Sequence, residues 1–120
     1  MYSTDSFELM LLSAIVKDND VFKKLIGLAD SQLFSSSMSS EVYEIVKDFF
    51  KQYSRTPSQS ELIYIYKRDR TVSDDMTITN FLNLIYTQEV DVKFVTNELN
   101  RYIKIRRFEN LFKISYEKLK

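Results

Sequence analysis

The side chains of this chain that could do chemistry are carboxylates, and they form two close groups. Asp18 and Asp20 are two positions apart and Asp74 and Asp75 are adjacent, so each group could bind a divalent cation. The chain has no His and no Cys, which removes the usual proton shuttle, thiolate nucleophiles and sulfur ligands for zinc. No His, and no matching cluster of ligands, accompanies either pair in the sequence. We therefore expect both pairs of carboxylates to cap helices rather than to bind a metal. Hydrolysis by a carboxylate pair stays an alternative, although no residue pattern frames one.

A phosphate-binding loop is excluded by the glycine content. Such a loop needs the pattern G-x-x-x-x-G-K-[S/T], which a chain whose single glycine is Gly27 cannot contain. We therefore expect no cofactor and no catalytic site in this chain. One glycine and one proline in 120 residues also disfavour the tight hairpins of a sheet, so the sequence predicts an all-α fold. The length and 44% hydrophobic residues fit one domain.

The charges balance overall but not locally. Seventeen basic and seventeen acidic residues cancel, which argues against a dedicated phosphate-binding surface. Residues 101–120 nevertheless hold seven basic and two acidic residues. These basic residues are expected to be a solvated face, with weak contact to DNA as the alternative, and the candidates are Arg101, Lys104, Arg106, Arg107 and Lys113. No apolar run approaches the ~20 residues of a membrane span, so we expect no membrane partner and a cytoplasmic location.

Apolar periodicity and capping residues predict six helices. The sharpest signal is "RTPSQSEL", in which Ser58 and Glu61 form an S-x-x-E capping box. Aromatic residues at helical spacing, Tyr43, Phe49, Phe50 and Tyr53, are expected in the core rather than as platforms for nucleic-acid bases. The other expected caps are Asp5 with Glu8, Asp18 to Asp20, Ser39 or Ser40, Asp74 or Asp75, and Asp91. The predicted arrangement is a compact bundle of about four helices in residues 1–72, followed by an antiparallel two-helix hairpin in residues 73–120.

The last predicted helix carries two apolar stripes on opposite faces. At 100° per residue the first stripe comprises Val92, Val95, Leu99, Tyr102 and Ile103, and the second comprises Ile105, Phe108, Phe112, Tyr116 and Leu119. A helix with two opposite stripes must bury each one against a different neighbour. We expect the first stripe to pack on its own domain and the second to form a subunit interface, shared with Phe81, Leu82 and Ile85 of the preceding helix. Packing of the second stripe on that helix alone is the alternative.

The order of these signals resembles the N-terminal domain of hexameric replicative DNA helicases of the DnaB family, most closely the versions in tailed bacteriophages. "ELMLLSAIVKDNDVFKKLI" looks like the opening helix of that family. "LFSSSMSSEVYEIVKDFFKQYSRTPSQSEL" is similar to its polar loop, aromatic helix and proline-marked cap. "FVTNELNRYIKIRRFENLF" resembles its long closing helix, with Tyr102 and Arg107 near positions where the family carries an aromatic residue and an arginine.

The resemblance implies a non-catalytic collar domain whose copies associate, and which docks a primase or a helicase loader and guides single-stranded DNA through the assembled ring. ATP and Mg²⁺ would be used by the motor domain of the parent protein, which is absent from this chain. A bacterial host cytoplasm is implied for a phage protein. The alternative is a stand-alone helical adaptor that dimerises through its last two helices. Because Lys120 falls inside a helical pattern with no C-cap, the sequence favours a truncated chain over a complete one.

Overall fold

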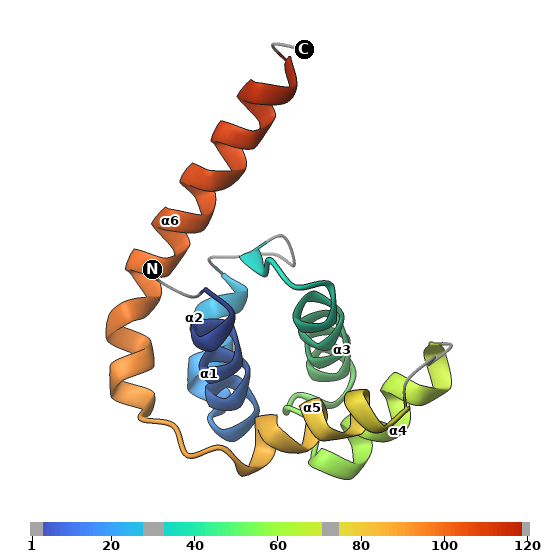
Figure 1. The fold of residues 1–120 in the computed structure, drawn as a ribbon. Helices are drawn as coiled ribbons and strands as arrows, with labels where there is room; N and C mark the ends of the chain where they lie inside the picture. Colours follow the sequence, from blue (N-terminus) through green and yellow to red (C-terminus); the bar gives the residue numbers. More distant parts are fainter. Residues whose placement is uncertain (1–3, 28–32, 71–74, 119–120) are drawn as a thin grey trace.

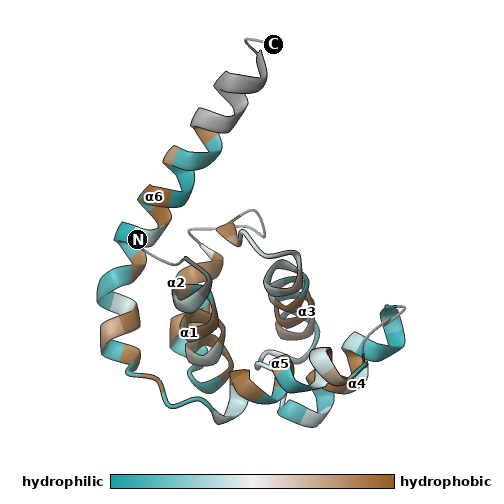
Figure 2. Ribbon diagram, viewed as in Figure 1, coloured by the Kyte–Doolittle hydropathy of each residue, from teal (hydrophilic) through white to brown (hydrophobic). Residues whose placement is uncertain are grey.

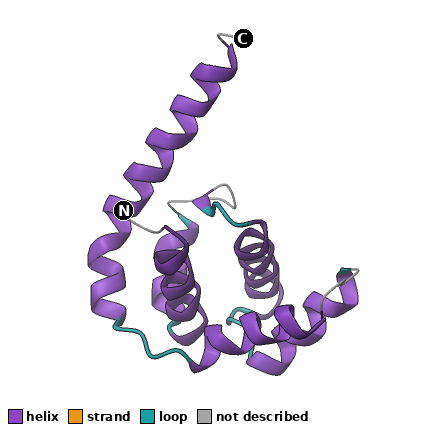
Figure 3. Ribbon diagram, viewed as in Figure 1, coloured by secondary structure: helices purple, strands orange, loops and turns teal. Residues whose placement is uncertain are grey.

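The computed structural model describes residues 4–27, 33–70 and 75–118, with the side chains of residues 6–27, 33–70 and 75–111. In these segments the chain forms helices and no strand, joined by short loops (Figure 3). The predicted all-α class, and the order of four helices followed by a pair that ends in a long helix, are confirmed. The helices are α1 (Thr4–Lys17), α2 (Asn19–Ile26), α3 (Ser37–Tyr53), α4 (Gln59–Asp69), α5 (Asp75–Thr87) and α6 (Val92–Lys118).

Local capping sets the starts of α2, α4 and α6 where the sequence predicts them. The Asp18 carboxylate accepts a hydrogen bond from the backbone N–H of Asp20 at 2.9 Å, which starts α2. Ser58 and Glu61 form the complete capping box of α4. The Asp91 carboxylate accepts hydrogen bonds from the backbone N–H groups of the second and third residues of α6, Lys93 and Phe94, at 3.0 and 3.2 Å.

The predicted start of α3 is wrong by three or four residues. Ser36 is the N-cap, because its hydroxyl accepts a hydrogen bond from the N–H of Ser39, and Ser39 itself is buried inside the first turn. Each serine of the run 35–40 has the side chain a cap requires, so the sequence alone could not choose among them. At its other end α3 stops at Ser54, which adopts the left-handed conformation with φ 61°.

The core forms around α1, whose apolar residues surround its axis. Figure 2 shows hydrophobic residues concentrated along α1 and α2 at the centre of the globule. Leu11, Leu12 and Ile15 are completely buried there, as expected for a helix that is apolar on all sides. One continuous cluster of buried residues draws members from every described helix, including Leu82 of α5 and Val95 of α6. The predicted division at residue 72 therefore does not divide the core.

The last two helices meet this core differently. After α5, which packs mainly against α1 and α4, the chain turns at residues 88–91, and α6 runs along α1 and then beyond the globule (Figure 1). Its 27 residues would span about 40 Å. The radius of gyration is 14.8 Å, above the roughly 13.6 Å expected for a compact chain of this length. A helix that projects beyond the globule raises the radius of gyration in this way.

Within the described segments, every helix is too short or too polar to cross a membrane.

Candidate functional site

The proximal half of α6 is bound to the globule by its first apolar stripe. Val95, Leu99, Tyr102 and Ile103 are all buried, and they belong to the same core cluster as α1. The Tyr102 ring also packs on Phe7 of α1, with 4.8 Å between ring centroids. The prediction that this stripe packs on its own domain is confirmed.

A buried polar network fixes this half of α6 more tightly than apolar packing alone would. The Tyr102 hydroxyl lies 3.1 Å from Oε1 of Glu8 and 3.0 Å from the carbonyl oxygen of Leu33, so its proton can be donated to either. Glu8 also accepts hydrogen bonds from the backbone N–H and the hydroxyl of Ser35. A carboxylate that is 1% exposed is tolerated only with such partners. The network joins α1, the segment before α3, and α6.

This placing of Glu8 corrects the predicted capping box with Asp5. The carboxylate points into the core, where it serves contacts 27 and 94 positions away in sequence. Spacing of three residues is the signal of a capping box, and it is equally compatible with a helix interior. The hydrogen bonds of Glu8 with Ser35 and Tyr102 show that Glu8 lies in the helix interior and is not part of a capping box.

The structure also corrects the role predicted for Arg106. Its Nε donates a hydrogen bond to the Leu33 carbonyl oxygen at 2.9 Å, and its Nη1 lies 2.6 Å from Oε2 of Glu109. The side chain is 11% exposed. A guanidinium held in this way is an anchor of α6 on the globule, and it is not free to contact DNA.

The distal half of α6 leaves the globule and exposes apolar side chains to solvent. Phe108 is 69% and Leu111 is 63% exposed, while Ile105 is partly buried at the exit from the globule. Lys104, Phe108 and Leu111 are spaced i, i+4 and i+7, which places them within about 60° of arc on one face. We call these three residues the distal strip. Phe112, Tyr116 and Leu119 of the predicted interface lie outside the described side chains.

The interface residues predicted on α5 separate into two groups. Leu82 and Ile85 are completely buried in the core of the chain itself, so they are unavailable to a second subunit and are corrected to core residues. Phe81 is partly buried and packs against the same core. The error arose because an apolar stripe on a helix does not say whether its neighbour is the same chain or another one.

Three of the other basic residues predicted for weak contact with DNA lie at the surface of α6. Arg101, Lys104 and Arg107 are exposed, and Arg101 lies 3.9 Å from the carboxylate of Glu98 on the same helix. Lys113 lies outside the described side chains. Lys104 belongs to the distal strip, and Arg101 and Arg107 lie on either side of it on the helix.

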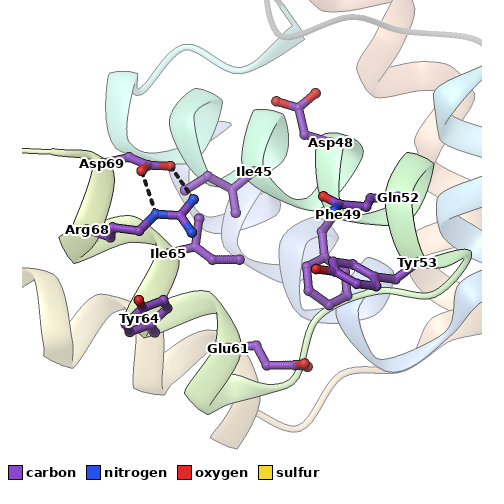
Figure 4. A pocket seen from close by; sticks show the side chains of 10 residues that line it. All are labelled: Ile45, Asp48, Phe49, Gln52, Tyr53, Glu61, Tyr64, Ile65, Arg68 and Asp69. Carbon is purple, nitrogen blue, oxygen red and sulfur yellow. Dashed lines mark hydrogen bonds and ion pairs between the residues drawn. The ribbon is translucent and has the colours of Figure 1, made fainter.

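A groove that the sequence did not predict lies between α3 and α4 (Figure 4). Its volume is about 420 Å³. Ile45 and Phe49 of α3 form a nearly buried floor, and Tyr53 and Tyr64 stand at the open side, 54% and 65% exposed. The other lining residues are Asp48, Gln52, Glu61, Ile65, Arg68 and Asp69. We call this set the α3–α4 groove.

Some of the aromatic residues predicted for the core are buried, and one is largely exposed to solvent. Tyr43 and Phe49 are buried and Phe50 is partly buried, so the core prediction is confirmed for them. It is wrong for Tyr53, whose ring packs on Phe49 with 4.5 Å between centroids but remains mostly open to solvent. The sequence signal that could have indicated a groove is Tyr64, which stands apart from the apolar stripe of α4.

Ion pairs fix three of the four charged residues that line the α3–α4 groove. Both oxygens of Glu61 accept hydrogen bonds from Arg55 at 2.9 Å, and this pairing lowers the pKa of Glu61 from 4.5 to about 2. Arg68 makes a two-pronged contact with Asp69, at 2.7 and 3.0 Å, which lowers the pKa of the Asp69 carboxyl. Both carboxylates are therefore ionised at neutral pH.

Two of the carboxylates that could have bound a metal have other partners in the structure. Asp18 caps α2, and Asp75 is the first residue of α5 and forms an ion pair with Lys67 at 3.0 Å. Asp74 lies outside the described residues. Across the described segments, no group of three or more metal-ligating side chains is brought together.

Comparison with protein-family models, curated proteins and solved structures finds no match to this chain. The likeness to the helicase collar domain therefore remains a prediction from the sequence.

Proposed function

We propose that this chain is a non-catalytic assembly domain that forms the N-terminal collar of an ATP-dependent replicative DNA helicase. Its contribution is geometric, since it would associate subunits and offer a docking surface to a primase or a helicase loader. Single-stranded DNA would be guided through the assembled ring. ATP and Mg²⁺ would be used by the motor domain of the parent protein, in the cytoplasm of a bacterial host.

The observation that supports this proposal is the change of face along α6. Its proximal half is anchored by buried apolar contacts and by the network of Glu8, Tyr102 and Arg106, whereas its distal half carries Phe108 and Leu111 into solvent. Burying a Phe or Leu side chain gains about 1.5–3 kcal/mol. A firmly held helix that presents two such side chains on one face is suited to contact a neighbouring molecule.

Association is tested directly by weakening the distal strip. We expect the chain to self-associate in a concentration series followed by light scattering or sedimentation velocity, and Phe108→Asp combined with Leu111→Asp to leave a folded monomer. The matched control is Phe94→Asp, which replaces a half-exposed phenylalanine on the proximal half of the same helix. A dimer or ring that survives the double substitution would remove the interface from this helix.

The helicase assignment has its own test in the reading frame that follows residue 120. A linker and then a glycine-rich phosphate loop would support the collar domain, and binding of a purified cognate primase or loader would identify the docking role. A stop codon immediately after residue 120 would favour the second candidate, a stand-alone adaptor that dimerises through its last two helices. The exposed distal strip favours that candidate equally, because one partner is enough to cover it.

A further inference from the structure

We propose that the distal strip of one copy docks into the α3–α4 groove of a second copy, so that subunits join head to tail. This inference rests on the self-association proposed above and adds the surface that receives the strip. The two surfaces lie on different parts of the same chain: α6 projects on one side of α1, and α3 and α4 lie on the other (Figure 1). Because α6 is continuous and runs along α1 before it projects beyond the globule, its distal half lies on the other side of α1 from α3 and α4 (Figure 1).

The α3–α4 groove has the chemistry to receive a helix with exposed apolar residues. Its floor of Ile45 and Phe49 is apolar, and the exposed rings of Tyr53 and Tyr64 can cover an inserted side chain from the two sides (Figure 4). Tyrosines of this kind contact a partner with an apolar ring while the hydroxyl stays in water. Arg68 already lies over the Tyr64 ring at 5.8 Å from its centroid.

The charges of the two surfaces are complementary. Three carboxylates and one guanidinium line the groove, which gives the lining a net charge of −2, or −1 when the flanking Arg55 is included. Asp48 is exposed and has no ion-pair partner within the described segments. The strip, in contrast, contains the exposed Lys104 one turn before Phe108, and the exposed Arg101 and Arg107 lie on either side of it on the helix. Opposite charges at the rim of an interface steer association and fix its register.

The lengths of the two surfaces also agree. From Lys104 to Leu111 the strip covers eight residues, and the seven steps between them span about 10 Å along the helix axis. The groove runs along α3 from Ile45 to Tyr53 and along α4 from Glu61 to Asp69, about 12 Å on each side. Two helical turns of the donor thus match two turns of each wall.

A symmetric pairing of two strips is disfavoured by charge. It would bring Arg101, Lys104 and Arg107 of both copies into one seam, whereas insertion into the groove places the same cations near carboxylates. In the head-to-tail arrangement each chain offers one strip and one groove. Such a contact produces a closed ring where the rotation between copies allows it, and an open chain otherwise.

Two single substitutions separate the two halves of the contact. Phe108→Asp damages the strip and leaves the groove intact, and Tyr64→Lys places a cation at the groove mouth and leaves the strip intact. Both side chains are largely exposed, so we expect folded proteins with unchanged circular dichroism. Gln52→Lys is a second groove variant, and Phe94→Asp is again the control that should associate normally.

The decisive measurement is sedimentation velocity on the two variants alone and mixed. We expect each variant alone to be monomeric, and the mixture to form a 1:1 heterodimer, because one intact strip then meets one intact groove. Reversing the rim charge with Asp48→Lys should weaken wild-type association about two- to fivefold, and Lys104→Glu in the partner should restore it.

The possible failures are distinguishable. If the wild-type chain stays monomeric at every concentration, the proposed self-association and this inference both fail. If Tyr64→Lys and Gln52→Lys associate like the wild type while Phe108→Asp does not, copies associate without the groove, and only the head-to-tail contact is refuted. A mixture of the two variants that remains monomeric, when wild type associates, refutes it as well.

Discussion

Removal of one buried hydroxyl should measure how firmly α6 is held on the globule. In Tyr102→Phe the ring keeps its place against Phe7, and only the hydroxyl that lies between Glu8 and Leu33 is lost. After the change, Glu8 still accepts two hydrogen bonds from Ser35, and the Leu33 carbonyl still accepts one from Arg106. No acceptor is left without a partner, so the full penalty of an orphaned buried group does not apply.

The expected loss of unfolding free energy in Tyr102→Phe follows from the hydrogen bonds that Glu8 and Leu33 keep. A hydrogen bond to a neutral acceptor contributes about 0.5–1.5 kcal/mol, and one to a charged group about 1.5–3 kcal/mol. Because a single proton serves both acceptors, we expect Tyr102→Phe to lower the free energy of unfolding by about 1–2 kcal/mol. Tyr102→Ala, which also opens a cavity beside Phe7, should cost about 3–5 kcal/mol.

Urea denaturation checks this, with the midpoint shifting and the slope unchanged if only stability is affected. Tyr64→Phe is the matched control, because it removes a tyrosine hydroxyl from an exposed position and should change stability by less than about 0.5 kcal/mol. Amide exchange should quicken first in residues 92–103 of the Tyr102 variant. If Tyr102→Phe and Tyr64→Phe proved equally harmless, the network would not be what secures α6, and the reasoning would be refuted.

Three further predictions concern stability. Arg55 lowers the pKa of Glu61 to about 2, so the stabilisation from the ionised carboxylate is complete above its ordinary pKa of 4.5 and is lost as the pH falls towards 2. The urea midpoints of the wild type and of Arg55→Met should therefore converge over that pH range. A difference in midpoint that stays constant with pH would contradict this prediction. Ser54→Gly should raise stability by about 0.5–1 kcal/mol, because glycine adopts the φ of 61° without strain, and an unchanged midpoint would show that Ser54 is not strained. Ile85→Ala should cost about 2–5 kcal/mol in unfolding free energy and leave self-association of the folded chain unchanged in light scattering, whereas a loss of association alone would return Ile85 to the interface.

The head-to-tail contact would give the two faces of α6 separate roles. The proximal face sets the direction in which the helix leaves the globule, and the distal strip makes the contact. A change in the packing of the proximal face would displace the distal strip, because a tilt of a rigid helix moves its far end. Weakening the anchor through Tyr102 should therefore reduce association as well as stability, even though Tyr102 itself is 1% exposed.

The sequence by itself determined the helices and most of their ends. One glycine, one proline and a regular apolar period admit an all-α chain, and a cap such as Ser58 with Glu61 works through atoms only three residues apart. The same local reasoning found the change of apolar face within α6, since the direction of each side chain on a helix depends only on its position along the axis.

Only the tertiary structure decided which neighbour each face meets. Glu8 is a buried acceptor because Tyr102, 94 residues later, packs beside it, and Arg106 is an anchor because the Leu33 carbonyl, 73 residues earlier, points towards it. Leu82 and Ile85 belong to the core, and the α3–α4 groove is lined by residues that the fold brings together from two helices. Periodicity fixes the face that a side chain occupies, but the partner of that face depends on how distant segments pack, and a local pattern carries no information about that.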